Sequence, residues 1–498
     1  MRAKVIVVLT FLLFSVASGL AGTEKVLYSF TGGLDGGQPY AGVIFDPAGN
    51  LYGVTQFGGA YNQGTVFELS PSPSGTWTET VLYSFTGGSD GSQPMYDLAM
   101  DGGGNLYGTA AYGGDSYCGT VYELSPSESG WTFTLLHTFG GKDDGCSPQA
   151  DLNFNGNRLL GTTAGGGCHS MGTAFRLFSD GVEVVYSFGG NNGNLPNGLT
   201  GDGFYGTSYF GGKPGEGVVF ELGYDFTEPC RSQIEVKHTF ASTGKAKATA
   251  AGYLPVGDLA TQGGSIMYGA TQSGGVGGFG TVYQLTNSRS VAWHISVLHS
   301  FTGLDGDGAM PWAGVVLDPA GNLYGTTSWG GAEWAGTVFE LTPGANNEWT
   351  ETVLYSFTGG ADGNSPISTI VLDGAGNVYG TTYQGGTYNQ GVVYEVTPGA
   401  ATTTTLTSSP NPSTYGQAVT FIAAVTSSAG APPDGETVSF MEGQTVLGTG
   451  SLSGGSASLT ISTLPKGTNS ITAAYGGDSN FVGSTSNVVK QKVEKERK

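Results

Sequence analysis

Two recurring loop sequences carry residue types that can recognise carbohydrate. The first, T-G-G-x-D-G-x-x-P, supplies a carboxylate, and the second, which follows an L-Y-G-T run, supplies aromatic side chains. Sugar C–H faces stack on aromatic rings while sugar hydroxyls hydrogen-bond to carboxylates, so this combination is suited to glycan binding. The candidate ligand-binding residues are Asp35, Asp90, Asp305, Asp362, Tyr61, Tyr117, Trp334 and Tyr388.

The same loops admit other interpretations. Asp-Gly is a turn dipeptide, and loop aromatics can simply pack between neighbouring repeats. Ca²⁺ is the one cofactor that the aspartates leave open, although it needs six or more converging oxygens and each loop supplies one or two. We otherwise expect no cofactor and assign no metal ligands.

Sequence motifs that signal catalysis do not occur. The chain has no H-E-x-x-H, Cys-pair zinc spacing, Gly-x-Ser-x-Gly or phosphate-binding loop. His137, His238 and His299 each replace the tyrosine of an L-Y-S-F run, which favours a structural position in a strand. A carboxylate pair for glycoside cleavage, brought together from distant repeats, stays an alternative. We therefore assign no catalytic residue.

The loops lie between strands of a tandem repeat. Three signatures recur in fixed order, namely L-Y-S-F, L-Y-G-T and G-T-V-F-E-L, at intervals of roughly 50 to 60 residues, which suits blades of four short strands. The L-Y-G-T glycines are Gly53, Gly108, Gly161, Gly206, Gly269, Gly325 and Gly380. The first copy predicts strands over 41–45, 50–55, 65–69 and 76–85, separated by turn residues such as D-P-A-G-N.

The two ends of the array predict how it closes. It opens with an isolated L-Y-S-F strand over residues 25–30 and ends with G-V-V-Y-E-V, after which no such strand follows. If L-Y-S-F is the outer strand of each blade, the N-terminal strand completes the last one and removes an exposed sheet edge. We predict an all-β fold in which residues 25–398 form a seven-bladed β-propeller closed by its N-terminal strand. Both loop sets then share one face.

Charge and the N-terminal sequence restrict location and partners. The 498 residues carry a formal charge of −21, which argues against binding nucleic acid or an anionic membrane. Residues 1–21 have the basic start, apolar run and small-residue end of a secretory signal peptide, and no other stretch approaches a membrane span. We expect a secreted or cell-surface protein, monomeric and without a transmembrane segment after cleavage.

A second domain follows the repeats. Residues 399–405, rich in threonine, predict a linker, and residues 494–498 a charged tail. Between them, over 406–493, short segments alternate apolar and polar residues, as in A-V-T-F-I-A-A-V. This pattern predicts an Ig-like β-sandwich.

The repeat signatures resemble a known family. Tandem units with L-Y-S-F, D-x-x-G-N-L-Y-G-T and G-T-V-F-E-L are similar to the GloVer repeats of bacterial choice-of-anchor surface proteins, over residues 25–398. The segment with S-x-x-P-x-P-S-x-x-G-Q-x-V-T-F and A-A-Y-G-G-D-S-N-F resembles a bacterial Ig-like domain. The resemblance implies export and surface display, and it brings no established catalytic residues.

The four cysteines fit an oxidising compartment. Cys118, Cys146 and Cys168 fall in loops on one predicted face, and we expect Cys146 to pair with Cys168 because both belong to the third copy. Cys230, on the opposite predicted face, is then unpaired or bonded to a partner protein.

These features lead to a functional hypothesis. We expect an exported, non-catalytic binding or adhesion protein whose partner is an extracellular glycan or a cell-surface protein. The alternative is a secreted propeller enzyme, a polysaccharide lyase, glycoside hydrolase or lactonase, that uses the same face.

Overall fold

The chain divides into two compact units. The computed structural model describes residues 22–495 except 157, 179–180, 201–204, 214, 224–229, 231–233, 242–250, 289–290, 346–347, 444 and 479. One unit spans Gly22–Pro398, and the other begins at Gly399. The predicted signal peptide and residues 496–498 of the predicted tail lie outside the described residues. In the described part of the chain, no helix is long and apolar enough to cross a membrane.

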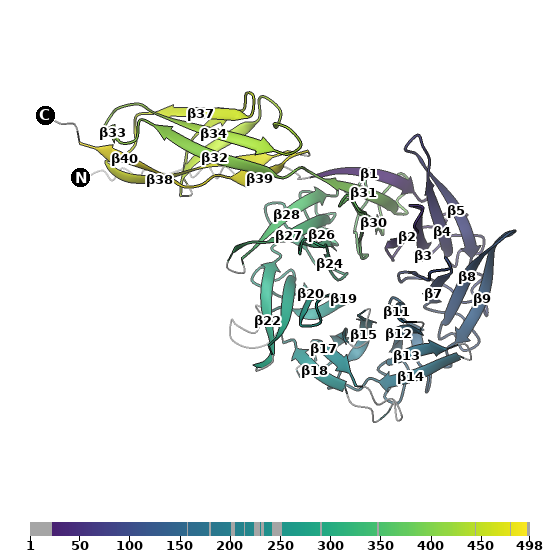
Figure 1. Ribbon diagram of the computed structural model, residues 1–498. Coiled ribbons are helices and arrows are strands. Elements are labelled where there is room, and N and C mark those ends of the chain that lie inside the picture. The colour runs from purple at the N-terminus through teal and green to yellow at the C-terminus, as the bar shows by residue number, and fades with distance from the viewer. Residues whose placement is uncertain are drawn as a thin grey trace, which may run out of the picture. The chain divides into compact units, whose positions relative to one another are not determined.

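Antiparallel sheets make up the first unit and are arranged in a propeller-like ring (Figure 1). In chain order, the described residues form a first sheet of β2 (Val43–Phe45), β3 (Leu51–Thr55), β4 (Thr65–Pro71) and β5 (Trp77–Ser84), a second of β6 (Ala99–Met100), β7 (Leu106–Ala110), β8 (Thr120–Ser127) and β9 (Gly130–Thr138), and a third of β10 (Cys146–Pro148), β11 (Asn153–Asn155), β12 (Arg158–Gly165), β13 (Thr173–Phe178) and β14 (Gly181–Ser187). The fourth sheet contains β15 (Asn194–Leu199), β16 (Tyr205–Phe210), β17 (Val218–Leu222) and β18 (Ile234–Thr239), and the fifth contains β19 (Tyr253–Gln262), β20 (Ile266–Ser273), β21 (Thr281–Ser288) and β22 (Val291–Ser300). The sixth contains β24 (Val316–Leu317), β25 (Leu323–Thr327), β27 (Thr337–Pro343) and β28 (Trp349–Ser356), and the seventh contains β29 (Val371–Leu372), β30 (Val378–Thr382), β31 (Val392–Pro398) and β1 (Gly22–Ser29). A short ribbon joins β23 (Gly308–Ala309) and β26 (Trp329–Gly330).

The N-terminal strand pairs with the last repeat, as the sequence predicts. β1 runs antiparallel to β31, with Val26 opposite Tyr394. The seventh sheet also contacts the first, because the buried Thr381 hydroxyl donates a hydrogen bond to the Ala41 carbonyl over 2.7 Å. The beginning and the end of the repeat array therefore lie together.

The glycine of L-Y-G-T makes room for an aromatic ring on the neighbouring strand. Gly53 lies directly opposite Phe67, and a Cβ at Gly53 would come within 2.6 Å of the Phe67 ring. Phe67 is fully buried and packs edge-to-face against Phe30 of L-Y-S-F, with ring centroids 5.1 Å apart. L-Y-G-T and G-T-V-F-E-L thus pair within one sheet, and the L-Y-S-F phenylalanine of the preceding sheet packs against them, which explains why the three signatures recur together.

The D-P-A-G-N segment forms a hairpin turn. In the first sheet, Asp46 Oδ1 accepts hydrogen bonds from the backbone N–H groups of Ala48 and Asn50. Partial burial raises the pKa of Asp46, but hydrogen bonds from Asn50 and Ala48 outweigh it and hold the pKa below its ordinary value. This aspartate therefore stabilises a turn.

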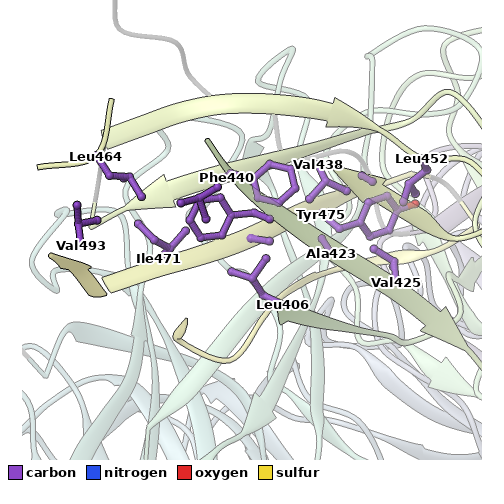
Figure 2. Close-up of a cluster of buried hydrophobic side chains, with 14 residues drawn as sticks. Leu406, Ala423, Val425, Val438, Phe440, Leu452, Leu464, Ile471, Tyr475 and Val493 are labelled. Atoms are coloured by element: carbon purple, nitrogen blue, oxygen red, sulfur yellow. The ribbon is translucent and has the colours of Figure 1, made fainter. Parts of the chain in front are cut away.

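The second unit is a two-sheet sandwich. One sheet joins β32 (Thr402–Ser409), β34 (Val419–Ser427) and β37 (Ser456–Ile461); the other joins β33 (Ser413–Thr414), β40 (Val489–Glu494), β38 (Gly467–Gly477), β35 (Thr437–Glu442) and β36 (Thr445–Ser451), with β39 (Val482–Thr485) against β38. Figure 2 shows its core, in which the Phe440 and Tyr475 rings lie among aliphatic side chains.

The predicted linker over 399–405 is wrong from Thr402 onward. Thr402 to Thr405 belong to β32, which pairs with β34. Threonine is β-branched and favours strands, and the side chains of Thr404 and Leu406 alternate into the core. A threonine-rich sequence therefore begins the sandwich.

Candidate functional site

A cavity of about 280 Å³ opens at the centre of the ring. All seven sheets contribute to its lining, mostly through the segments around their first strands, with Tyr209 added from β16. Tyr40, Tyr96, Tyr209 and Trp312 supply aromatic surface, and Asp97, Asp151 and Asp258 supply carboxyl groups.

The three carboxyl groups break the repeat symmetry. Each aspartate is the third residue after the proline that ends a loop between two sheets. The residues at this place in the other sheets are Gly42, Leu199, Gly314 and Thr369. An acidic cluster at the centre is therefore a property of three particular sheets, the second, third and fifth.

Hydrogen bonds to neighbouring sheets hold these carboxyl groups in place. Asp97 Oδ1 accepts the Gly42 N–H over 2.6 Å, and Asp151 Oδ1 accepts the Asp97 N–H over 2.7 Å. Asp258 Oδ2 accepts a hydrogen bond from Asn153 Nδ2 over 3.0 Å. Since each of these bonds joins different sheets, the positions of the acids depend on the assembled ring.

Burial favours the protonated form of these acids. Desolvation, followed by the charge of Asp151, raises the pKa of Asp97 and of Asp258 well above the ordinary value. Desolvation also raises the pKa of Asp151, although the hydrogen bond from Asp97 opposes it. A protonated carboxyl group donates one hydrogen bond and accepts another, so it can bind both sides of a sugar hydroxyl. The same property is required of a general acid.

Aromatic and amide side chains surround the acids. The Tyr40 ring lies edge-on to Tyr96, with centroids 6.2 Å apart, and to Tyr383, with centroids 5.9 Å apart. The Tyr383 hydroxyl oxygen lies 3.1 Å from Oε1 of Gln38 and 3.1 Å from Oε1 of Gln56 and donates its one proton between them. These contacts fix rings beside a polar cavity, an arrangement suited to a ligand with apolar faces and hydroxyl groups.

The predicted aspartates lie elsewhere and stabilise their own loops. Asp35 Oδ2 accepts the Tyr28 hydroxyl over 3.0 Å and the Thr31 N–H over 2.8 Å, and Asp90 and Asp362 make the equivalent bonds. In the loop after the fifth sheet, Asp307 accepts from Thr302 and takes this role, while Asp305 has a φ of 55°. None of these four predicted residues lines the central cavity.

The predicted aromatic residues are exposed on loops. Tyr61 and Tyr388 are 60% and 58% exposed, while Tyr117 and Trp334 have φ values of 55° and 59°, a conformation that is unusual for bulky residues. The Trp334 ring contacts Phe279, with centroids 6.2 Å apart. These aromatics also lie outside the cavity lining, so the structure does not group them with the central acids.

The central acids were missed by the sequence analysis, although a signal exists. Counting three residues from the loop proline places Asp97, Asp151 and Asp258 in one column of the repeats. The column lacks acidic residues in the other copies, so these three aspartates depart from the repeat pattern and mark a single site.

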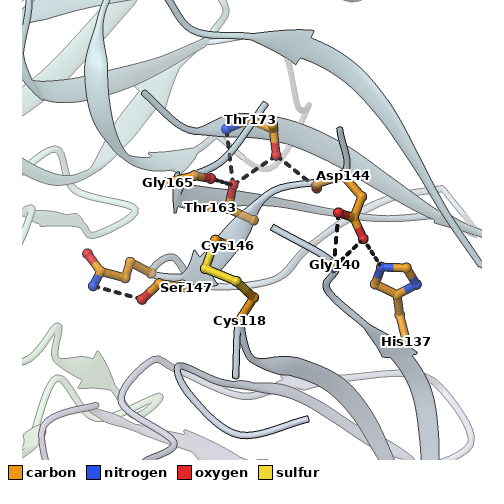
Figure 3. Close-up of a disulfide and its surroundings, with 10 residues drawn as sticks. Cys118, His137, Gly140, Asp144, Cys146, Ser147, Thr163, Gly165 and Thr173 are labelled. Atoms are coloured by element: carbon orange, nitrogen blue, oxygen red, sulfur yellow. Dashed lines mark hydrogen bonds and ion pairs between the residues drawn. A yellow bond between two sulfur atoms is a disulfide. The ribbon is translucent and has the colours of Figure 1, made fainter. Parts of the chain in front are cut away.

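The predicted disulfide is wrong. Cys146 pairs with Cys118, as Figure 3 shows, and Cys168 pairs with Cys230, so Cys230 is not free. Cys118 lies against the loop of the third sheet, where its carbonyl accepts the Ser147 N–H over 2.7 Å. The prediction assumed pairing within one copy, but both disulfides join loops of neighbouring copies.

The solved structures that match this chain are distant from it. The extracellular domain of a protein assigned to the hybrid two-component systems of B. thetaiotaomicron has 11% identity and a TM-score of 0.42, with 96% of this chain and 60% of that chain covered. A GH43 β-xylosidase/α-arabinofuranosidase from a compost microbial metagenome has 11% identity and a TM-score of 0.29, covering 76% and 95%. Trypanosoma rangeli sialidase has 11% identity and a TM-score of 0.31, covering 72% and 55%.

Family models match most of the chain. The bacterial Ig-like domain (group 3) matches residues 406–494, and the Gloeobacter/Verrucomicrobia repeat matches residues 12–203 and 255–430. No curated protein matches. The repeat match covers about three quarters of the chain, including every copy of the signatures except the one between residues 204 and 254, and the chain belongs to the Gloeobacter/Verrucomicrobia repeat family.

Proposed function

We propose that this protein is exported and acts as a non-catalytic binding or adhesion protein that recognises extracellular carbohydrate. The binding site is the central cavity of a closed seven-bladed propeller. One observation carries the proposal: carboxyl groups unique to three sheets meet aromatic rings in a single central cavity. The Ig-like domain and the resemblance to surface proteins support display outside the cell.

The cavity favours a particular class of sugar. Asp97, Asp151 and Asp258 bring negative charge or neutral carboxyl groups and lie close enough to influence one another. Ionisation of any one of these acids would repel an anionic sugar such as a uronic acid, whereas a neutral sugar finds hydrogen-bond partners on the carboxyl groups in either protonation state. The volume of about 280 Å³ is at the low end for ligand pockets, which suits a terminal sugar of a longer chain.

A binding measurement with a displaced acid tests this proposal. A Cβ at Gly198 would overlap Oδ1 of Asp258, so Gly198→Ala moves that carboxyl group without deleting it. We expect wild-type protein to bind neutral or amino glycans on an array, and Gly198→Ala to weaken binding by tenfold or more in calorimetry. Trp334→Ala, outside the cavity, serves as the matched control and should bind normally.

Two outcomes would overturn the proposal. Loss of binding in Trp334→Ala with normal binding in Gly198→Ala would place the site on the loops that carry Tyr61, Tyr117 and Tyr388. Preference for uronic acids over neutral sugars would contradict the role given to the central acids.

A second candidate is a secreted glycoside hydrolase. The observation in its favour is that several carboxyl groups share one cavity and that burial raises the pKa of Asp97 and Asp258, because glycoside cleavage needs one protonated carboxyl group as the general acid beside a second carboxyl group. Incubation with neutral polysaccharides, followed by measurement of new reducing ends, separates the two functions. Turnover that Asp151→Asn abolishes would establish the enzyme, and binding without turnover would support the binding protein.

A further inference from the structure

One group of histidine and carboxylate side chains lies outside the central cavity, at a different position of the repeat from the central acids. Among the described residues, His299, Asp307 and Glu351 bring one potential metal-ligand atom each within 4.8 Å of one another. His299 comes from β22 of the fifth sheet, Asp307 from the following loop and Glu351 from β28 of the sixth sheet. The group therefore bridges two adjacent sheets, and the cavity has none of these residues in its lining.

The same place occurs in other sheets with a tyrosine instead of the histidine. Glu351 pairs with Leu341, and the corresponding residues Glu79 and Glu24 pair with Leu69 and Val396. Glu79 interacts with Tyr28 and Asp35, and Glu24 with Tyr355 and Asp362. A neutral phenol is a poor metal ligand, whereas an imidazole nitrogen is a good one. Only the place between the fifth and sixth sheets, within the described residues, combines histidine with both carboxylates.

His137 occupies the position of His299 in the second sheet, but the neighbouring sheet supplies no glutamate there. His137 Nε2 lies 3.1 Å from Asp144 Oδ2 after the second sheet, as Figure 3 shows. The residue in the register of Glu351 is here Val182, which pairs with Leu177 in the third sheet. This pair thus has the imidazole and one carboxylate but no third ligand from the neighbouring sheet.

The local geometry leaves a ligand atom of Glu351 without a partner. Glu351 Oε1 is buried and accepts no hydrogen bond from the described residues, which costs free energy unless a cation or donor faces it; Glu24 and Glu79 share this feature, but only Glu351 lies within ligand reach of an imidazole. His299 Nε2 lies 3.3 Å from Asp307 Oδ1. Two ligands at 2.0–2.2 Å from a tetrahedral Zn²⁺ are roughly 3.4 Å apart, so this separation already suits a shared ion.

We propose that His299, Asp307 and Glu351 bind a divalent transition-metal ion, with Zn²⁺ as the representative. One imidazole and two carboxylates form a ligand set for this class of ion. The His299 and Asp307 side chains are 21% and 14% exposed, which gives water access to a fourth ligand position. The ion would join the loop after the fifth sheet to the outer strand of the sixth and so stabilise their contact.

A zinc titration tests the site with a variant that the repeat itself supplies. Untagged full-length protein is treated with a chelator, dialysed and titrated with Zn²⁺ in a calorimeter. We expect one ion per chain, with an increase in melting temperature. His299→Tyr should weaken binding at least tenfold and retain the fold, since Tyr83, Tyr186 and Tyr355 occupy this position in other sheets. Glu351→Gln should also weaken binding, and His137→Tyr, the matched control, should leave it unchanged.

The reverse substitution should add a second Zn²⁺ site, a result that loss of folding cannot produce. Tyr355→His places an imidazole beside Asp362 and Glu24, and we expect the stoichiometry to rise from one Zn²⁺ ion per chain to two. Wild-type protein that binds no Zn²⁺, or a His299→Tyr variant that binds as well as wild type, would overturn the proposal. Loss of binding in His137→Tyr alone would move the site to the second sheet.

Discussion

Burial of the Glu24 and Glu79 carboxyl groups costs free energy of folding, and the sequence gives no sign of this burial. Each has an Oε1 atom that is buried without a hydrogen-bond partner among the described residues. Desolvation, followed by the charge of Asp362 or Asp35, raises the pKa of each carboxyl group to about 7. Because the folded protein holds these protons more tightly than the unfolded chain does, both residues make stability depend on pH.

The sign of this dependence gives a prediction for Glu79. A raised pKa in the folded state means that the contribution to stability is full below about 4.5 and is lost as the pH rises through about 7. We expect the free energy of unfolding in urea to fall between pH 5 and pH 8, and Glu79→Gln to reduce that fall. The exposed Glu128 provides the control variant, Glu128→Gln. An unchanged pH dependence in Glu79→Gln would contradict the assignment.

Single residues were predictable where local sequence decides their role. Asp46 caps a turn because its partners lie two and four residues further along the chain. The cysteine pairing and the central acids were not predictable in this way, since Cys118 meets Cys146 and Asp97 meets Gly42 across different sheets. Contacts of that kind depend on which loops the ring places side by side.

At the scale of elements, the contact between the seventh and first sheets decides whether the array is continuous. Thr381 on β30 donates to the Ala41 carbonyl, and the sixth and seventh sheets repeat this bond between Thr326 and the Ser368 carbonyl. The two bonds are chemically alike. The bond from Thr326 to Ser368 joins two consecutive repeats, and the bond from Thr381 to Ala41 joins the last repeat to the first.

This comparison predicts costs of the same order for two substitutions, although the Thr381 hydroxyl also lies 3.0 Å from Ser368 Oγ. Thr381→Val leaves the buried Ala41 carbonyl without its donor, which should lower the free energy of unfolding by about 1–3 kcal/mol. Thr326→Val is the matched variant and should cost about the same, as measured by urea unfolding. A negligible cost for Thr381→Val beside a clear cost for Thr326→Val would show that the seventh and first sheets do not pack as the other pairs do.

Strand order was largely predictable because each signature marks one strand. L-Y-G-T and G-T-V-F-E-L pair through Gly53 and Phe67, and the residues that make the pairing necessary are visible in the sequence. The first strand of the second unit was harder to predict from the sequence. A threonine run such as Thr402 to Thr405 is polar enough for a linker and β-branched enough for a strand, and its pairing with β34 decides between them.

On the scale of the whole molecule, the two units have separate hydrophobic cores. The sandwich encloses Phe421, Phe440 and Tyr475, all from its own strands, and the ring packs its aromatic rows between its own sheets. A domain with its own core can fold independently.

We therefore expect each unit to fold when expressed alone. Residues 399–498 should unfold cooperatively and give dispersed NMR spectra, and residues 22–398 should keep the β-rich circular dichroism of the full chain. The melting temperature of each part should lie within about 3 °C of a transition in the full chain. An isolated sandwich that is unfolded, with a full chain that melts in one transition, would show that its stability depends on the repeats.

The pairing of β1 with β31 also concerns how the protein is made. During translation β1 emerges long before β31 is made, so it stays unpaired through the synthesis of every intervening repeat. The nascent protein therefore carries two unmatched edges until its last repeat forms. In a crowded compartment, two such molecules that finish late can exchange their leading segments, so slow maturation should yield interlocked dimers.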